Sequence, residues 1–328
     1  MNVFQESIAQ AAAWPVDLPV PPADFDGRRV VIVIPAYNEE RFIGSVVLKL
    51  RAYPVTIVVV DDGSSDQTAL IAQAAGAEVI RHDCNQGKGA ALNTGLRAAR
   101  QLEPDVLVLI DGDGQHLPEQ LPRLVEPVLS GEADLVVGSR YLLRPVGVPR
   151  HRVWGHRFFS WLTRSASGVP VSDSQSGYRA LSPRACREDL FHSTGFSVES
   201  EMQFQAHELG LRVMEVPVTI RYTDKPKRPV WQQGLVVLNG VIKLTGQYRP
   251  LFFFGVPGAL LLVVGVGFAF WVVQRFLEVG QIAIGTALFS LLASMFGLIM
   301  LSTGFTLHSV RGLLFDMLHH HLRDDNPA

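Results

Sequence analysis

The chain has few of the features that mark secreted, disulfide-rich or nucleic-acid-binding proteins. Its 328 residues contain two cysteines, Cys84 and Cys186, too few and too far apart for a disulfide framework or a cysteine metal site. Lys and Arg number 29 against 31 Asp and Glu, so the formal net charge of −2 does not indicate nucleic-acid binding. No basic segment followed by an apolar core opens the chain, and we therefore expect no cleaved signal peptide.

Charge is absent from two long stretches near the C-terminus. Neither residues 251–273 nor residues 279–307 contain Asp, Glu, Lys or Arg. Each stretch is long enough to cross the hydrocarbon core of a bilayer as a helix. Because both are apolar on all sides, we favour two membrane spans over the buried helical hairpin of a soluble protein. The spans are predicted at about 251–273 and 281–307.

Basic residues flank the two apolar stretches and predict their orientation. Lys243 and Arg249 precede the first stretch, and Arg311 and Arg323 follow the second. The expected hairpin loop, Gln274–Gly280, carries only one Arg and one Glu. Positive charge collects on the cytoplasmic side of membranes, so we expect a multi-pass protein with both termini and its polar part in the cytoplasm.

These patterns divide the chain into three parts. Residues 1–27 combine a short amphipathic piece with a proline-rich linker, and residues 28–228 have the pattern of an α/β domain. Residues 229–328 contain a juxtamembrane amphipathic helix, the two spans and a tail. The tail includes His319–His321, which we interpret as an exposed segment rather than a metal cluster.

Short apolar runs alternate with helical patterns in the α/β domain and predict a parallel or mixed sheet with helices on both faces. Strands are expected at 29–34, 56–60, 78–81, 106–110 and 133–138. The run at 106–110 ends in two carboxylates, Asp111 and Asp113, and the run at 56–60 ends in Asp61 and Asp62. Because ligands bind outside the carboxyl ends of parallel strands, these side chains are expected to line one crevice.

Asp113 and Gln115 offer hard oxygen ligands two residues apart, which suit Mg²⁺ or Mn²⁺. A divalent ion held by few protein groups usually completes its coordination shell with substrate phosphates. The simpler alternative is a strand followed by an Asp/Gly turn, and this stretch by itself leaves both interpretations open.

Several motifs in order resemble family 2 glycosyltransferases of the GT-A fold. They are Pro-Ala-Tyr-Asn-Glu at 35–39, Val-Asp-Asp-Gly-Ser-Ser-Asp at 60–66, Asn-Gln-Gly-Lys-Gly-Ala-Ala-Leu-Asn at 85–93 and Asp-Gly-Asp-Gly-Gln-His-Leu-Pro at 111–118. Gly-Ser-Arg at 138–140 and Asp-Ser-Gln-Ser-Gly-Tyr-Arg at 173–179 are similar to the dolichol-phosphate mannose synthase branch. The resemblance implies transfer of a sugar from a GDP- or UDP-sugar to a polyprenyl phosphate, dolichyl or undecaprenyl, with inversion.

The resemblance also implies a role for individual residues. The residues that it implies for donor binding are Pro35, Tyr37, Glu39, Val60, Asp62, Asp111, Gly112, Asp113, Arg140, Arg221 and Lys227. Catalysis falls to Asp113, Arg140, Arg179 and Glu201, the acceptor phosphate to Arg150, Arg152 and Ser176, and the divalent metal to Asp113 and Gln115. Lys225 is an alternative to Lys227. Residues 150–163 mix basic and aromatic side chains, which is typical of an interfacial helix or of a core helix with a basic face.

Two other functions are compatible with the fold. One is a membrane-bound family 2 enzyme with a hydroxyl acceptor, in polysaccharide or glycolipid synthesis, but a processive synthase would need more spans and a Gln-x-x-Arg-Trp motif. The other is an inactive membrane scaffold, which the intact set of Asp111, Asp113 and Gln115 argues against. The sugar, the nucleotide, the carrier and a homo-oligomeric state are left open.

Overall fold

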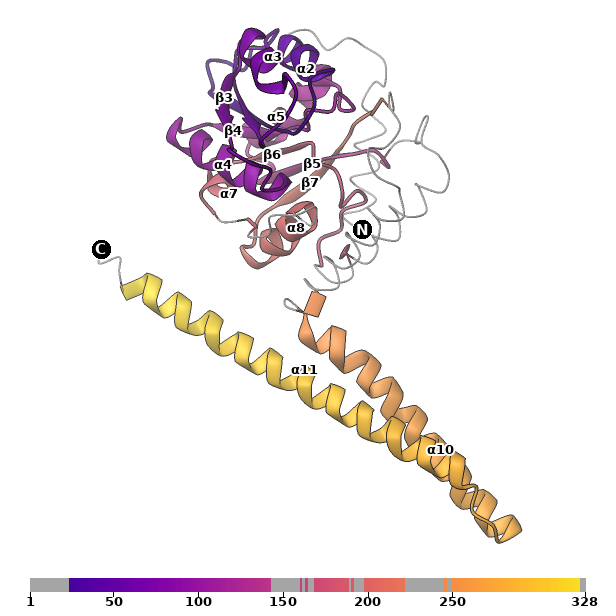
Figure 1. Cartoon of the computed structure of the whole chain (residues 1–328). Helices are drawn as coiled ribbons and strands as arrows, with labels where there is room; N and C mark the ends of the chain where they lie inside the picture. Colours follow the sequence, from indigo (N-terminus) through magenta and orange to yellow (C-terminus); the bar gives the residue numbers. More distant parts are fainter. Residues whose placement is uncertain are drawn as a thin grey trace. The chain divides into compact units, whose positions relative to one another are not determined.

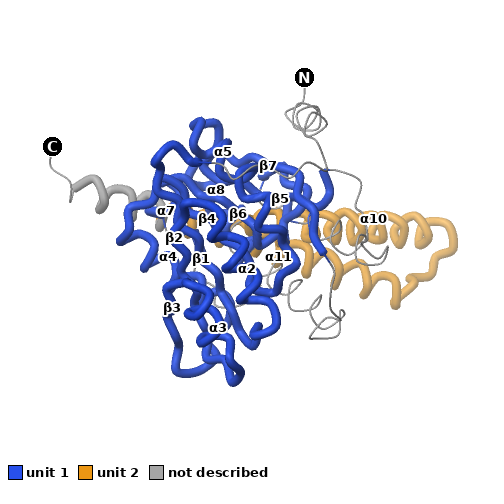
Figure 2. The backbone as a smooth tube through the Cα atoms, turned by 90° about the horizontal axis from the view of Figure 1, so that it is seen from above, with its two compact units in different colours: residues 1–241 blue, residues 242–328 orange. Residues whose placement is uncertain are grey.

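The computed structural model describes residues 24–142, 160, 163–164, 168–188, 190–191, 198–221, 245–246 and 249–324, with side chains as far as Leu313. The chain forms two compact units, Met1–Val241 and Ile242–Ala328 (Figure 2). Residues 1–23 of the predicted N-terminal segment 1–27 lie outside the described residues, as do most of residues 150–163 and of the juxtamembrane helix, which is expected at 231–248. The predicted boundary at 228 lies there too, so these assignments stay predictions.

A mixed sheet organises the first unit. Among the described residues its strand order is β3-β2-β1-β4-β6-β5-β7. The strands are β1 Val30–Ala36, β2 Val55–Asp61, β3 Glu78–Arg81, β4 Val106–Leu109, β5 Leu135–Ser139, β6 Arg179–Leu181 and β7 Val213–Pro217. Strands β1 to β4 run parallel, and β6 is antiparallel to both β4 and β5. The predicted mixed sheet is confirmed, but the sequence did not predict β6.

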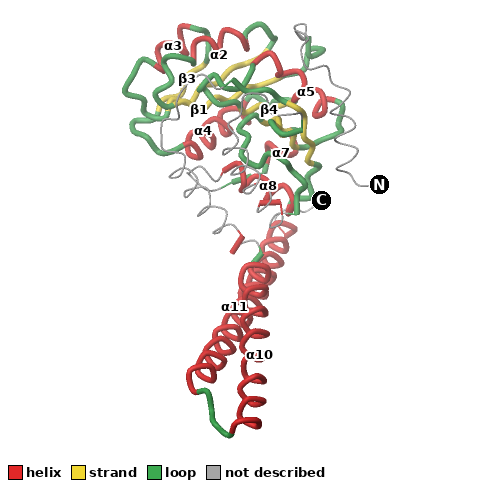
Figure 3. The backbone as a smooth tube through the Cα atoms, turned by 90° about the vertical axis from the view of Figure 1, so that its right-hand side faces the viewer, coloured by secondary structure: helices red, strands yellow, loops and turns green. Residues whose placement is uncertain are grey.

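Helices cover both faces of this sheet (Figures 1 and 3). They are α2 Ile43–Leu50, α3 Thr68–Ala74, α4 Lys88–Gln101, α5 Leu121–Leu129 (preceded by the 3-10 turn Pro118–Gln120), α7 Pro183–Arg187 and α8 Val198–Glu208. Alternate residues of β1 enter two separate cores: Ile32 packs on the side of α2 and α5, and Val33 on the side of α4 and α8. Because successive side chains of a strand point to opposite faces, the single apolar run of β1 contributes to the core on each face of the sheet.

Three strands end where the candidate site begins. β1, β2 and β4 pair in register and point the same way, so Ala36, Asp61 and Leu109 leave the sheet along one edge. The segment after β7 returns to this edge, because Ile220 bridges His116 and the Arg221 N–H donates to the Gln115 carbonyl at 2.9 Å. The topology thus gathers segments from both halves of the domain around residues 111–116.

The second unit consists of two long helices that follow a π-helical turn, Leu251–Gly255. They are α10 Val256–Val279 and α11 Ile284–Asp324, which lie side by side (Figure 1). Leu251–Val279 and Ile284–Leu313 are long and apolar enough to cross a membrane, and only 11% and 17% of their most apolar windows are buried. Such an exposed apolar surface is typical of a segment solvated by lipid rather than of a soluble core.

Glycines allow the two helices to pack closely. A Cβ on Gly265 would collide with Ser294, and a Cβ on Gly297 would collide with the backbone of Leu262. The Ser290 hydroxyl donates to the Gly265 carbonyl at 2.9 Å, so this polar group is satisfied inside the hairpin. Small residues and interhelical hydrogen bonds are the usual means by which membrane helices associate.

The hairpin loop predicted at 274–280 is wrong in its bounds. Helix α10 continues to Val279, and Arg275 approaches Glu278 at 3.5 Å on the same helix. Gly280, with φ of 69°, ends the helix in the left-handed conformation that glycine adopts at little cost. Charged residues therefore mark the end of the apolar run without marking the end of the helix.

Leu107 tests the contribution of the core to stability. It lies fully buried on the central strand β4, whereas Leu70 on α3 is 68% exposed. We expect Leu107→Ala to lower the free energy of unfolding of the α/β unit by about 2–5 kcal/mol, because it leaves a cavity. Leu70→Ala should stay within about 0.5 kcal/mol of the unchanged protein. Urea unfolding of the detergent-solubilised proteins measures both, and equal shifts would contradict the assigned core.

Candidate active site

The loops that follow β1 and β2 are fastened to each other by hydrogen bonds. The Asn38 N–H donates to the Ser64 hydroxyl at 2.9 Å, and the Ser65 N–H donates to the Asn38 side-chain oxygen at 3.0 Å. The Glu39 N–H donates to the Thr68 hydroxyl at 2.8 Å. Tyr37 stands exposed on this edge of the crevice. The two loops that carry the predicted donor-binding residues thus form one rigid wall.

Asp62 holds the loop before α4 in place. Its carboxylate accepts the backbone N–H groups of Gln86 at 2.9 Å and Gly87 at 2.8 Å. The same carboxylate pairs with His82 Nδ1 at 2.8 Å, and His82 Nε2 lies 3.0 Å from the Thr94 hydroxyl. Asp62 is therefore a buried anchor of the crevice, and its predicted contact with the donor would be made through the loop that it positions.

Lys88 connects two carboxylates at the centre of the site. It is the first residue of α4, and its ammonium lies 2.6 Å from Asp111 at the end of β4 and 2.6 Å from Glu199 on α8. Burial alone would lower the pKa of Lys88, but the two carboxylates outweigh it and raise that pKa above its usual value. Despite its burial, Asp111 has a lowered pKa because Lys88 stabilises its charge. The three side chains form a charged cluster, called the Lys88 cluster below.

Asp113 lies beside this cluster with an unusually high affinity for a proton. Burial, followed by repulsion from Asp111 and Glu39, raises the pKa of Asp113 to about 6. One of its oxygens accepts the Gln115 N–H at 3.0 Å, and Gly114 makes the turn with φ of 69°. A divalent cation would relieve the same repulsion that favours protonation. Asp113 is therefore suited to bind a cation, and the assignment of Asp113 and Gln115 as metal ligands stays a prediction.

The described residues contain no group of three or more His, Cys, Asp or Glu side chains arranged to hold a metal. A cation at Asp113 and Gln115 would therefore receive few ligands from those residues.

His116 is a site residue that the sequence did not predict. It is buried against the ring of Tyr178, with the ring centroids 5.2 Å apart, and its Nε2 lies 3.9 Å from Asp111. Burial lowers the pKa of His116 to about 4, so the imidazole is neutral near pH 7. Its place within the motif at 111–118 was the only signal that could have identified it.

Arg140 is held by a carboxylate that the sequence motif already contained. Its Nε lies 2.5 Å and its Nη2 2.6 Å from the two oxygens of Asp173, a bidentate pair. Asp173 is anchored in turn, since its N–H donates to Glu215 at 3.1 Å. Burial raises the pKa of Glu215 to about 7. A donor phosphate at Arg140, as predicted, would share the guanidinium with Asp173.

Arg179 lies inside the domain rather than on the crevice surface. Its side chain is buried and donates to the carbonyls of Ser176 at 2.9 Å and Ser174 at 3.1 Å. Burial lowers the pKa of Arg179 to about 10, so it still carries its charge at neutral pH. Arg179 thus shapes the loop 173–177, whose Gly177 packs so closely on Asp111 that a Cβ would collide with the carboxylate. The catalytic role predicted for Arg179 stays a prediction.

The remaining predicted residues divide into three groups. Pro35, Val60, Gly112 and Ser176 are buried, and their predicted roles stay predictions. Glu201 is buried on α8, but the α8 carboxylate that joins the Lys88 cluster is Glu199, so the assignment of Glu201 stays a prediction. Arg150, Arg152, Lys225 and Lys227 lie outside the described residues.

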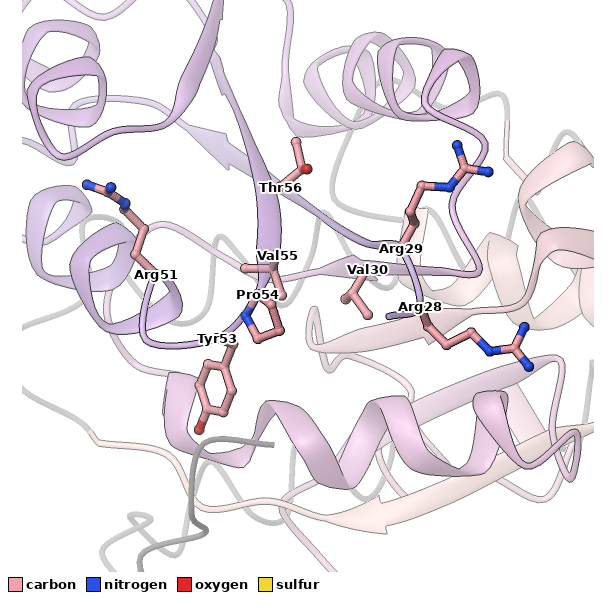
Figure 4. A pocket seen from close by; sticks show the side chains of 8 residues that line it. All are labelled: Arg28, Arg29, Val30, Arg51, Tyr53, Pro54, Val55 and Thr56. Atoms are coloured by element: carbon pink, nitrogen blue, oxygen red, sulfur yellow. The ribbon is translucent and has the colours of Figure 1, made fainter. Parts of the chain in front are cut away.

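A separate cavity of about 420 Å³ lies where β1 and β2 begin, far along the sheet from these strand ends (Figure 4). Arg28, Arg29 and Arg51 line it, but their guanidinium groups are directed to Asp105, the Leu102 carbonyl and the Ala75 carbonyl. Figure 4 shows their charged ends pointing apart rather than converging. This cavity therefore lacks the convergent polar groups of a ligand site.

Comparison with known proteins agrees with the geometry. Residues 31–191 match the family model described as glycosyl transferase family 2. The undecaprenyl-phosphate mannosyltransferase of Micrococcus luteus is 35% identical over 66% of this chain and 93% of its own length. The UDP-N-acetylglucosamine–dolichyl-phosphate N-acetylglucosaminyltransferase of Methanococcus voltae is 33% identical over 60% of this chain and 87% of its own.

Solved structures show the same fold. The glucosyl-3-phosphoglycerate synthase of Mycobacterium tuberculosis, crystallised with Mn²⁺, UDP and glucosyl-3-phosphoglycerate, superposes with a TM-score of 0.54 and 27% identity. That alignment covers 67% of this chain and 81% of the other. The predicted GT-A fold and the predicted enzyme class are confirmed, and the chain belongs to glycosyl transferase family 2.

Proposed function

We propose that this glycosyltransferase moves a sugar from a GDP- or UDP-sugar to a polyprenyl phosphate at the cytoplasmic face of a membrane. The proposal rests on the two carboxylates, Asp111 and Asp113, that follow strand β4 in a chain that also contains two exposed apolar helices. The M. luteus and M. voltae relatives are named for transfer to undecaprenyl and dolichyl phosphate, which supports this acceptor class.

Asp113 and Gln115 are the residues that would hold Mg²⁺ or Mn²⁺. When bound, the cation would neutralise charge on the leaving diphosphate of the donor. Asp111 keeps its negative charge because Lys88 is paired with it, and Gly177 restrains its carboxylate. Arg140, oriented by Asp173, places a planar guanidinium beside this edge of the sheet and so adds positive charge where phosphates would meet.

Four carboxylates of the site are already paired, which supports a phosphate acceptor over a hydroxyl acceptor. Asp62 is bonded to two backbone amides, Asp111 and Glu199 to Lys88, and Asp173 to Arg140. A hydroxyl acceptor needs a base that can take its proton. A phosphate monoester has a second pKa of about 6 and is largely dianionic at neutral pH, so its oxygen attacks with little help from a base.

Direct attack of that oxygen on the anomeric carbon would break the bond to the donor diphosphate and form a sugar–phosphate bond. The configuration at the anomeric carbon would be inverted. The main task of the protein is then to bring two anions together and hold them in line, which positioning and fixed positive charge accomplish. The two apolar helices would keep the enzyme at the membrane where the polyprenyl tail resides.

The metal ligand can be tested by substitution and by chelation. We expect Asp113→Ala to abolish sugar transfer while the melting temperature stays near that of the unchanged protein, because the half-buried carboxylate lies outside the apolar core and its loss leaves no core cavity. EDTA should remove activity, and added Mg²⁺ or Mn²⁺ should restore it. Full activity of Asp113→Ala, or undiminished transfer in EDTA, would contradict this assignment.

The acceptor can be tested with paired lipids of equal chain length. Radiolabelled sugar should pass to a short polyprenyl phosphate but not to the corresponding free polyprenol. Arg150→Ala or Arg152→Ala should slow transfer to the lipid phosphate roughly ten- to a hundred-fold, the scale of a lost charged hydrogen bond. Lys at either position should restore part of the rate, because it keeps the charge but not the forked geometry. Equal transfer to both lipids would favour the hydroxyl-acceptor alternative.

The membrane assignment can be tested by extraction and by tag accessibility. The full chain should stay with membranes in carbonate or high salt and be released by detergent. Epitope tags at both ends should resist protease added outside intact cells and be cleaved after the cells are opened. Release by carbonate would contradict spanning helices, and cleavage of either tag in intact cells would contradict the proposed orientation.

A further inference from the structure

Lys88 belongs to a motif that contains none of the predicted site residues. It lies in Asn-Gln-Gly-Lys-Gly-Ala at 85–90 and begins α4 directly after Gly87, whose φ of 97° suits glycine. The Asp62 carboxylate fixes the loop before it through the amides of Gln86 and Gly87. The backbone that delivers the Lys88 side chain is therefore held in position before any ligand binds.

The ammonium of Lys88 pairs with two carboxylates that come from different parts of the chain. Asp111 belongs to the strand end that carries the predicted metal ligand two residues later, whereas Glu199 belongs to α8, 111 residues away from Lys88 in sequence. The Lys88 side chain is 19% exposed and that of Glu199 8%, so water screens this charge poorly. A positive charge fixed here acts on any cation held at Asp113.

We propose that Lys88, held by Glu199, is a positioning residue that orients Asp111 and weakens the affinity of the Asp113–Gln115 site for its divalent cation. The proposal rests on the proposed function, since it presumes a cation at those two ligands. The ammonium of Lys88 lies 2.6 Å from Asp111, two residues before Asp113, so its charge is close to the proposed cation. Glu199 opposes Lys88 with one negative charge, so the two residues set the local field together.

A weakened cation site has a consequence for turnover. A site that holds a cation too tightly would also retain the diphosphate product bound to it. Lys88 keeps Asp111 charged and oriented. Its positive charge also offsets the negative charge of Asp111, so Asp111 and Asp113 together attract a cation less strongly than two unpaired carboxylates would. The cation would then bind well only together with a diphosphate.

The test measures Mn²⁺ binding to the full-length protein by the loss of the free-ion electron paramagnetic resonance signal, alone and with UDP or GDP present. Lys88→Met should bind Mn²⁺ about tenfold more tightly than the unchanged protein, because a nearby positive charge is lost. Glu199→Gln should bind it several-fold more weakly. Lys88→Arg, which keeps the charge, should bind Mn²⁺ nearly as the unchanged protein does.

The double variant Lys88→Met/Glu199→Gln separates charge from geometry. It removes one positive and one negative charge, so its Mn²⁺ affinity should return close to that of the unchanged protein. Its rate of sugar transfer should stay low, because Asp111 has lost the ammonium that orients it. Lys49→Met is the matched control, since Lys49 pairs with Glu119 at 3.0 Å on an exposed surface and should change neither quantity.

Melting temperatures establish that each variant is folded, and Glu199→Gln decides the outcome if Lys88→Met is not. Unchanged or weaker Mn²⁺ binding by folded Lys88→Met, or unchanged or tighter binding by Glu199→Gln, would overturn the inference while leaving the metal site in place. Failure of the unchanged protein to bind Mn²⁺ with or without nucleotide would overturn both this inference and the metal-dependent function.

Discussion

Negative charge gathered along one edge of a sheet is the constraint on which the rest of the site depends. Parallel strands end together, so Asp62 and Asp111 emerge within the same small region. Each is compensated differently: backbone amides hold Asp62, and Lys88 holds Asp111. Asp113 keeps a pKa raised to about 6 by burial and by its acidic neighbours, which makes it the carboxylate prepared for a cation.

The second half of the domain completes this arrangement from the opposite direction. Antiparallel β6 enters between β4 and β5, and the loop before it presses Gly177 against Asp111. The Arg179 guanidinium donates hydrogen bonds to two carbonyl groups of that loop. Asp173, on the same loop, forms an ion pair with Arg140. The loop before β6 and the first residue of β6 thus support side chains that follow β4 and β5, the strands on either side of β6, and several buried polar groups cluster there.

The helical unit answers a different physical demand. Its surface is apolar, whereas that of the α/β domain is mostly polar. Its two helices pack closely at Gly265, Gly297 and Ser290. In lipid, packing of small residues replaces the hydrophobic effect as the source of helix association. The proposed transfer from a water-soluble donor to a lipid-linked acceptor would use both kinds of surface.

The sequence by itself determined the buried strands, the strand-end motifs, the family and the apolar helices, because these depend on local periodicity and on residues close together in the chain. Only the tertiary structure decided that Lys88 joins Asp111 to Glu199, that Asp173 grips Arg140, and that Arg179 is buried. It also revealed β6, since three residues are too few to show a period. Contacts between residues as far apart as 111 positions arise from packing, and no local pattern encodes them.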